Sequence, residues 1–368
     1  MTIDRVGEIL EKLVAFQTVS TASNLDLVDW VETLLKRAGF STSRIPSACG
    51  TKAGLLARFG GGEGGVLLSA HTDVVPVEGQ AWSRDPFGLT RIDDRLYGRG
   101  ATDMKGFIAC VLAHAESLRE HQPDRPVMIA LSFDEEVGCR GIPQMIDRVI
   151  PFLGRPDVCI VGEPTLMRPA TSHKGKASYH ALCRGTPGHS AMAPKFLNAL
   201  HLGADLIMAL RAEQARLIAS GARDADCDPP FSTVHAGIMR GGKALNIVPD
   251  RAEVDFEIRH LAAEPPADIL ENIRAGLPDG IEITETGAYP GLDTDPDNPA
   301  LRPIMDALDD AAPCKLAFGT EAGFFSNLGI PTLVCGPGTM DDGHQPDESI
   351  AISQLALCLD FLKRITLP

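Results

Sequence analysis

The segment Val127-Met-Ile-Ala-Leu-Ser-Phe-Asp-Glu-Glu136 is the strongest indication of the architecture, because a run of mainly apolar residues leads directly into three acids. Strands that lack alternation of apolar and polar residues are typical of a parallel sheet with both faces covered. Short apolar runs also occur at 66–70, 158–161 and 332–335, and residues 104–118 have the apolar spacing of a helix. We therefore expect an α/β domain with a mostly parallel central sheet.

A different pattern begins after about residue 173. Six segments follow one another in the order strand, helix, strand, strand, helix, strand, which is the ferredoxin-like arrangement. Helical patterns then resume near residues 299–311 and 349–364. This order predicts a small α+β domain at 174–285, inserted into a larger domain formed by 1–173 and 286–368. The six segments are 176–184, 194–221, 233–239, 252–259, 267–275 and 281–284.

Composition limits the classes of function. The net charge of -15 over 368 residues argues against a nucleic-acid partner, which would attract a basic surface. Nine cysteines without a CxxC pair suit a reducing compartment, so a cytoplasmic location is expected. Residues 1–10 lack the pattern of a signal peptide. Apolar segments such as 106–113 are too short to span a bilayer, so no membrane association is expected.

Five side chains of the types that bind divalent metals lie near predicted strand ends or at a predicted helix start. In open α/β sheets, ligands collect at the carboxyl ends of the strands. Two histidines and three carboxylates hold two divalent ions if one carboxylate bridges them, and such a pair activates water against an amide or ester. The five residues are His71, Asp103, Glu136, Glu163 and His344.

Two neighbouring acids have possible supporting roles. Glu135 precedes Glu136 and is suited to proton transfer. Asp73 lies two residues after His71 and is suited to orienting its imidazole. If Glu135 and Glu136 both serve one site, the chain must turn at this point, which Gly138 permits.

Each piece of this set also has an ordinary explanation. His71 and Asp73 fit a solvated loop, Asp103 fits a helix cap, and residues 134–136 fit a solvated turn. His344, taken alone, fits a surface position. A chance placement of all five metal-type residues at such positions is improbable, so the metal hypothesis is preferred.

At this point the sequence resembles the dinuclear zinc amidohydrolases, the family that includes acetylornithine deacetylase, succinyl-diaminopimelate desuccinylase, aminoacylase and glutamate carboxypeptidase. The resemblance covers essentially the whole chain, and the set of motifs is specific although each one alone is not. It implies a zinc-peptidase-like catalytic domain with an inserted dimerisation domain. The matching segments are 69–73, 98–106, 134–138, 162–165, 184–190, 246–250 and 344–348.

The resemblance also implies how the metal ligands are shared. Asp103 would bridge two ions, with His71 and Glu163 completing one site and Glu136 and His344 the other. Zinc is the expected metal, and cobalt or manganese would suit the same ligands. A cis peptide bond is expected between Asp103 and Met104.

Further roles follow from the same resemblance. Glu135 would move the proton of the attacking water, and Asp73 would support His71. His189 would stabilise the oxyanion from a partner subunit of a homodimer formed by the inserted domain. Asn246 and Arg259 would hold the substrate carboxylate. Taken without the family, His189 fits a turn residue and Arg259 a solvated strand end.

Within the family, segments 173–175 and 318–325 are most similar to the acetylornithine deacetylase branch. This similarity implies hydrolysis of N2-acetyl-L-ornithine to L-ornithine and acetate, a step of arginine biosynthesis, with Thr320 and Glu321 near the substrate. Glu321 would pair with the side-chain ammonium, or would simply favour a helix N-terminus. The alternatives are a deacylase or dipeptidase for another N-acyl amino acid and, from a different class, an inactive metal-binding interaction protein.

Overall fold

The computed structural model describes residues 2–309 and 311–367. The chain forms two compact units. The first comprises Met1–Ser172, Asp293–Cys314 and Thr320–Pro368, and the second comprises His173–Leu292 and Lys315–Gly319.

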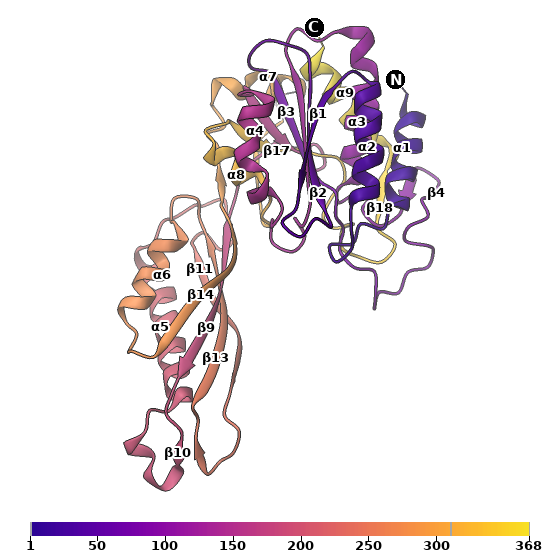
Figure 1. Cartoon of the computed structure of the whole chain (residues 1–368). Coiled ribbons are helices and arrows are strands. Elements are labelled where there is room, and N and C mark those ends of the chain that lie inside the picture. Colours follow the sequence, from indigo (N-terminus) through magenta and orange to yellow (C-terminus); the bar gives the residue numbers. More distant parts are fainter. Residues whose placement is uncertain (1, 310, 368) are drawn as a thin grey trace. The chain divides into compact units, whose positions relative to one another are not determined.

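A large sheet forms the centre of the first unit, with the strand order β1-β2-β6-β3-β7-β17-β8-β15 and β16 beside β8 (Figure 1). The four central strands β6, β3, β7 and β17 are parallel, whereas β1, β2 and β8 pair antiparallel. The expected mostly parallel central sheet is therefore confirmed. The strands are β1 (Ser41–Pro46), β2 (Ala53–Phe59), β3 (Val66–His71), β6 (Val127–Ser132), β7 (Val158–Val161), β8 (Ala170–His173), β15 (Leu292–Asp293), β16 (Cys314–Leu316) and β17 (Thr332–Val334).

Helices cover both faces of this sheet. On one face α1, α2 and α9 pack against α3, while α4 and α8 lie on the other (Figure 1). Every residue of α3 from Lys105 to Ala115 is buried, because the helix lies between the sheet and other helices. The helices are α1 (Ile3–Ala15), α2 (Leu25–Arg37), α3 (Lys105–His121), α4 (Ile146–Leu153), α7 (Arg302–Ala307), α8 (Ala322–Asn327) and α9 (Ile352–Thr366).

A small separate sheet joins distant parts of the first unit. Its hairpin of β4 (Thr90–Ile92) and β5 (Arg95–Tyr97) pairs with β18 (Ser349–Ala351) through β5. Asp93 lies at the turn of this hairpin and has a φ of 51°. This pairing attaches the segment before α9 to the segment before α3.

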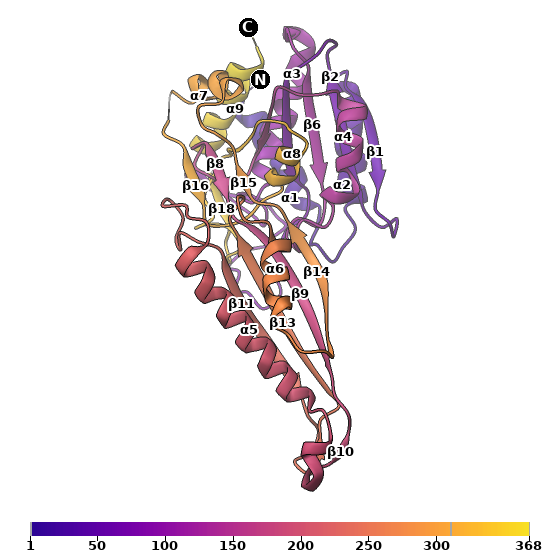
Figure 2. The same ribbon diagram turned by 90° about the vertical axis from the view of Figure 1, so that its left-hand side faces the viewer.

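The second unit is a four-stranded antiparallel sheet with two helices on one face (Figure 2). The strand order β11-β13-β9-β14 and the chain order βαββαβ confirm the ferredoxin-like arrangement. Lys176 near the start of β9 pairs with Tyr289 at the end of β14. The elements are β9 (Gly175–Arg184), β10 (Gly188–His189), α5 (Ala199–Ser220), β11 (Thr233–Gly241), β12 (Ile247–Val248), β13 (Arg251–His260), α6 (Pro266–Ala275) and β14 (Ile281–Tyr289).

Strict alternation along its strands explains the core of the second unit. β9 and β13 both alternate between buried and half-buried residues. The buried set includes Ala177, Tyr179 and Phe256, and Leu206 of α5 packs into the same cluster. Because side chains alternate between faces, one face of this sheet is covered by helices and the other is polar.

Two helix starts differ from the sequence prediction. The long helix begins at Ala199 rather than Pro194, because residues 190–195 form a separate 3₁₀ turn and Asn198 caps the helix. The helix expected at 299–311 is a 3₁₀ turn followed by the short α7. A proline indicates that a helix begins nearby, but it does not show at which residue the regular α-helix starts.

Candidate metal centre

The carboxyl ends of three parallel strands place metal-type side chains at one edge of the sheet. Val66 of β3 is level with Val127 of β6 and with Val158 of β7, so the ends of these strands are aligned. β3 ends at His71 itself, and β7 is followed by Glu163 after one residue. The strand ends therefore provide ligands that are distant in sequence but close in space.

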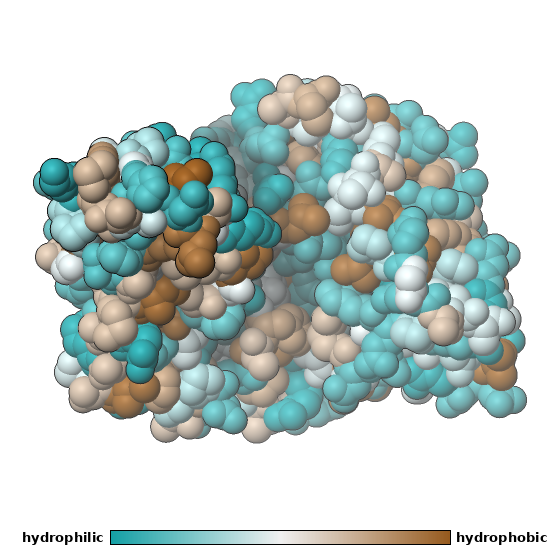
Figure 3. Space-filling view, turned by 90° about the horizontal axis from the view of Figure 1, so that it is seen from below, coloured by the Kyte–Doolittle hydropathy of each residue, from teal (hydrophilic) through white to brown (hydrophobic). Residues whose placement is uncertain are grey.

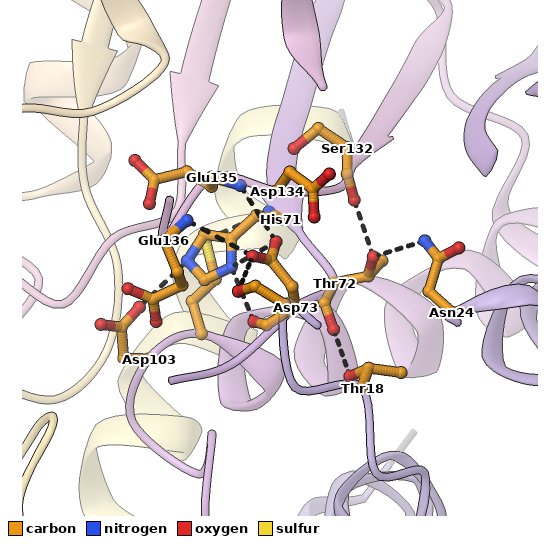
Figure 4. A network of polar contacts seen from close by, with 12 residues as sticks. Thr18, Asn24, His71, Thr72, Asp73, Asp103, Ser132, Asp134, Glu135 and Glu136 are labelled. Atoms are coloured by element: carbon orange, nitrogen blue, oxygen red, sulfur yellow. Dashed lines mark hydrogen bonds and ion pairs between the residues drawn. The ribbon is translucent and has the colours of Figure 1, made fainter. Parts of the chain in front are cut away.

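All five predicted metal ligands converge. The two carboxylate oxygens of Asp103 face different imidazoles: Oδ1 lies 3.1 Å from Nε2 of His71, and Oδ2 lies 3.1 Å from Nε2 of His344. Glu163 Oε1 lies 3.6 Å from Nε2 of His71, and Glu136 Oε2 lies 3.0 Å from Nε2 of His344. Asp103 thus lies between two separate groups of ligands, and Figure 4 shows it below His71 and Glu136.

A tight turn follows β6 and directs two successive acids toward the site. Asp134 has a φ of 57° and Gly138 a φ of 100°, and the backbone N–H of Cys139 donates to the carbonyl of Glu135. The expected change of chain direction at this point is confirmed. It allows Glu135 and Glu136 to serve the same site, although neighbouring residues of a strand would face opposite ways.

Asp73 supports the site mainly through backbone groups. Its carboxylate accepts hydrogen bonds from the N–H groups of Glu135 and Glu136 at 3.1 and 3.3 Å, and from the hydroxyl of Ser20 at 2.6 Å. Nδ1 of His71 lies 2.9 Å from the Asp73 carbonyl oxygen and 3.7 Å from its carboxylate. Figure 4 shows Asp73 among His71, Glu135 and Glu136. The backbone of Asp73 therefore orients His71, while its side chain holds the turn after β6.

At this site the carboxylates outnumber the basic side chains that could neutralise them. Burial and the Asp103 carboxylate raise the pKa of Glu136 to about 7. Burial and neighbouring acids raise the pKa of Glu163 and of Glu135 well above the usual range. Burial tends to lower the pKa of His71, but the carboxylates of Glu163 and Asp103 outweigh this effect and raise it. Such crowding of acids favours a bound cation.

These side chains fit divalent metal ions. Ligand atoms of His71, Asp103 and Glu136 lie within 4.8 Å of one another, as do those of His71, Glu135 and Glu163. The second oxygen of Glu136, Oε1, is buried and has no hydrogen-bond partner among the described residues. Imidazole and carboxylate donors suit zinc, cobalt or manganese.

Asp103 does not cap the helix that follows it. Met104 holds the N-cap position of α3, and no side chain caps that helix end. The peptide bond between Asp103 and Met104 is cis, as expected from the resemblance. The helix-cap explanation of Asp103 is therefore wrong.

Thr320 and Glu321 belong to the same unit and are both buried. The Thr320 hydroxyl accepts a hydrogen bond from the N–H of Ala322, the first residue of α8, and Glu321 between them holds the N-cap position. Glu321 precedes α8 and is 1% exposed, and burial raises its pKa to about 7. The Glu321 carboxylate also contributes to raising the pKa of Glu135 and of Cys139. Glu321 therefore lies within electrostatic range of Glu135, the proton-transfer candidate.

The remaining predicted residues belong to the second unit and separate into two places. His189 and Asn246 are neighbours, since β10 pairs with β12 and the N–H of Ser190 donates to the carbonyl of Asn246. Arg259 lies near the opposite end of β13, where its guanidinium donates to Glu257 and to the Tyr289 hydroxyl. From Arg251 to Arg259 the strand rises about 26 Å. Within one chain, Asn246 and Arg259 therefore do not form one carboxylate site.

Several polar residues around the metal centre were not assigned roles from the sequence. Ser20 binds Asp73, and the buried pair of Arg99 and Glu348 contacts the loop before Asp103. Glu348 is the last residue of the matching segment 344–348, and Arg99 lies inside the matching segment 98–106. The sequence shows that Arg99 and Glu348 lie in matching segments, but only the folded structure shows that they are buried.

The fold and the paired ligand groups define a metal-dependent hydrolase. The chain matches the model of peptidase family M20/M25/M40 over residues 67–367, and it belongs to that family. It is accordingly a metal-dependent amidohydrolase.

Related proteins cover nearly the whole chain. An acetylornithine deacetylase of Myxococcus xanthus is 35% identical in an alignment of 379 positions that covers 99% of this chain and 97% of that protein. An M20 family metallo-carboxypeptidase of Sulfolobus solfataricus has a TM-score of 0.77 at 19% identity, with 98% of each chain covered. Human carnosine dipeptidase 1 has a TM-score of 0.69 at 17% identity, covering 99% of this chain and 97% of that one.

None of the helices in the described part of the chain is both long enough and apolar enough to cross a membrane.

Proposed function

We propose that the protein hydrolyses N2-acetyl-L-ornithine to L-ornithine and acetate, as a cytoplasmic enzyme of arginine biosynthesis. The main support is the paired ligand set around Asp103, together with the similarity to acetylornithine deacetylase over almost the full length. None of the nine cysteines is in a disulfide, which agrees with a reducing compartment.

Two bound cations, for which zinc is the expected metal, would polarise the amide carbonyl and lower the pKa of the water that they bind. Asp103 would contact both ions, His71 and Glu163 one of them, and Glu136 and His344 the other. The ring nitrogen of His71 that faces away from the site already contacts the Asp73 carbonyl, which fixes the imidazole for binding through Nε2.

Glu135 is the proposed proton carrier. Its carboxylate lies with the imidazole of His71 and the carboxylate of Glu163 in one group of metal-type side chains, but the proposed ligand sets of the two ions do not include it. It would accept a proton from the attacking water and return one to the departing amine. The raised pKa caused by burial and neighbouring acids suits a group that must hold a proton for part of the cycle.

Glu321 is the proposed basis of preference for a cationic side chain. A buried carboxylate beside the centre would favour the ammonium of ornithine over a neutral side chain. Thr320 would position Glu321 through its hydrogen bond to the N–H of Ala322 at the start of α8.

We also infer a homodimer formed by the second unit. β11 lies at an edge of its sheet, and exposed apolar residues gather on this unit (brown, on the left in Figure 3). The separation of Arg259 from His189 and Asn246 within one chain fits a site to which two subunits contribute. In that arrangement His189 and Asn246 of one subunit and Arg259 of the other would contact the substrate. The exposed apolar residues include Met208, Ile218, Ile238, Met239, Leu245 and Ile247.

A substrate panel tests the proposed reaction. Purified enzyme supplied with Zn²⁺ or Co²⁺ is incubated with N2-acetyl-L-ornithine, N-acetyl derivatives of neutral amino acids, and dipeptides, and free acetate and free amine are measured. The largest kcat/KM is expected for N2-acetyl-L-ornithine. Activity confined to neutral N-acyl amino acids or to dipeptides would reject the ornithine assignment and favour the deacylase or dipeptidase alternative. Absence of turnover with every substrate would favour the inactive interaction protein.

A further inference from the structure

We propose that Arg99, Glu348 and Gln80 form a polar network that positions both halves of the metal centre. This inference deepens the proposed function, since it concerns how the same site is held in place. The network connects two loops that are far apart in sequence, the loop that ends at Asp103 and the loop that contains His344.

Glu348 organises the loop that presents the bridging carboxylate. Its Oε1 accepts hydrogen bonds from the N–H groups of Thr102 and Asp103 at 2.9 and 3.1 Å, and its Oε2 accepts one from Gly100 at 3.0 Å. The Glu348 side chain is 1% exposed. A carboxylate that accepts three backbone hydrogen bonds fixes the direction of the following residue, so Glu348 sets the position of Asp103.

Arg99 joins this carboxylate to a second polar side chain. Its NH1 donates to Oε2 of Glu348 at 2.6 Å, and its NH2 donates to Oε1 of Gln80. The guanidinium also lies over the ring of Trp82, 4.9 Å from the ring centre. Arg99 is fully buried, so its planar fork has a fixed direction toward both partners.

Gln80 extends the network to the other loop. Its Oε1 accepts from Arg99 and from Nε1 of Trp82 at 3.0 Å, and its Nε2 donates to the carbonyl oxygen of His344 at 2.8 Å. His344 has a φ of 58°, a conformation that residues other than glycine rarely adopt without support. The hydrogen bond from Gln80 therefore holds the backbone of the most exposed metal ligand.

Stability alone does not explain this arrangement. A buried ion pair contributes little net stability, because removing both charges from water offsets their attraction. The partners of Arg99 and Glu348 are the backbone before Asp103 and the side chain that holds His344. A network placed in this way is expected to affect metal affinity more than folding, as residues behind metal ligands generally do.

The two ends of the network make different predictions. Of the five predicted metal ligands, all of which the structure describes, Gln80 hydrogen-bonds to His344 alone, so Gln80→Ala should weaken the binding of one of the two ions by about 10–100-fold and change that of the other much less. Glu348 holds Asp103, the residue proposed to contact both ions, so Glu348→Gln should weaken the binding of both ions. Arg99→Gln should resemble Glu348→Gln, because it leaves the buried carboxylate without its charged partner.

The experiment is a calorimetric titration of Zn²⁺ into the full chain after removal of metal, with stepwise binding constants for each variant. His344→Ala identifies the step that depends on His344, and Gln80→Ala should weaken that same step. Gln17→Ala, an exposed glutamine of the same unit, and Glu282→Gln, an exposed glutamate of the second unit, are the matched controls. Urea unfolding of each metal-free variant measures the change in stability separately.

The network is rejected if both binding steps in Gln80→Ala and Glu348→Gln equal those of the controls. It is also rejected if Gln80→Ala weakens the two steps equally and only in proportion to lost stability. If Glu348→Gln does not fold, the two binding steps of Gln80→Ala alone decide whether the network is rejected. Wild-type protein that binds two ions but hydrolyses no N-acyl amino acid would reject the proposed reaction and leave the network untouched.

Discussion

Asp73 illustrates how a residue can have the expected importance through a different contact. The sequence predicted that its carboxylate would orient His71, yet the carboxylate accepts from the backbone of Glu135 and Glu136 while the Asp73 carbonyl faces the imidazole. Spacing in sequence indicates which residues are close. It does not indicate whether the side chain or the main chain makes the contact.

Glu135→Gln tests the proposed proton carrier. The amide keeps the shape of the side chain but cannot accept the proton, so kcat should fall by at least 10²–10⁴-fold, while KM changes little. Metal analysis should still find two ions per chain, because Glu135 is not a proposed ligand. Turnover close to wild type would contradict the role, and loss of metal would show that Glu135 is a ligand instead.

At the scale of elements, the ends of β3, β6 and β7 place the ligands, and close packing against α3 fixes those ends. A Cβ atom added at Gly162, between β7 and Glu163, would lie 2.0 Å from the ring of Phe107. The Phe107 ring has no room to move aside, because this residue is 1% exposed.

Gly162→Ala should therefore lower the free energy of unfolding by about 1–3 kcal/mol and weaken metal binding, because the strand end must shift. Gly61→Ala is the control, since a Cβ there meets nothing within 4 Å. Urea unfolding followed by tryptophan fluorescence reports on the first unit, which contains both tryptophans, Trp30 and Trp82. Equal stability of the two variants would contradict the packing argument.

His114 on α3 gives the first unit a dependence on pH that is separate from the metal centre. Burial, with smaller contributions from Lys363 and His121, lowers the pKa of His114 to about 4 from a usual value near 6.5. Between these two values the unfolded chain binds a proton that the folded chain does not. The free energy of unfolding therefore falls as the pH decreases from 6.5 to 4.

His114→Gln should remove this part of the acid sensitivity. At pH 5 the wild type should have lost about 2 kcal/mol more than the variant, relative to each protein at pH 7.5. Tryptophan-monitored urea unfolding at the two pH values measures the difference. The same acid sensitivity in both proteins would show that His114 is protonated in the folded state.

The length of the helices was harder to predict than their existence. Residues 194–221 and 299–311 have helical patterns, but the regular helices are 199–220 and 302–307. Asn24 holds the N-cap position of α2, but its side chain binds the backbone of Ala53 and the hydroxyl of Thr72 instead of the helix end. Tertiary contacts redirect such polar side chains, and a single sequence does not show these contacts.

At the scale of the whole molecule, the parallel sheet, the ferredoxin-like insertion and the metal-type residues at strand ends were predictable, because periodicity and position relative to strand ends determine them. The burial of Arg99 and Glu348 was not, since charged residues are usually exposed and only the assembled fold shows otherwise. The family resemblance supplied the allocation of ligands to two ions, and the site residues' roles stay predictions until tested.

The proposed dimer is tested on the edge strand β11, where Ile238 and Met239 are 45% and 43% exposed. The double substitution Ile238→Asp and Met239→Asp should convert a dimer to a monomer, because paired acids would face each other across the contact. Light scattering after size-exclusion chromatography measures the mass. Leu357→Asp on α9, also an exposed apolar position, is the control and should not change it. A monomeric wild type would contradict the proposal.

The pairing of Lys176 with Tyr289 places the entry and exit of the second unit on adjacent strands. Neighbouring strands lie about 5 Å apart, so a short loop would bridge the gap if everything between were deleted. We therefore expect the insertion to be separable from the metal centre, because all five predicted ligands belong to the first unit. A chain with a short loop in place of the insertion is expected to bind metal but to lose the contributions proposed for His189, Asn246 and Arg259, which belong to the second unit.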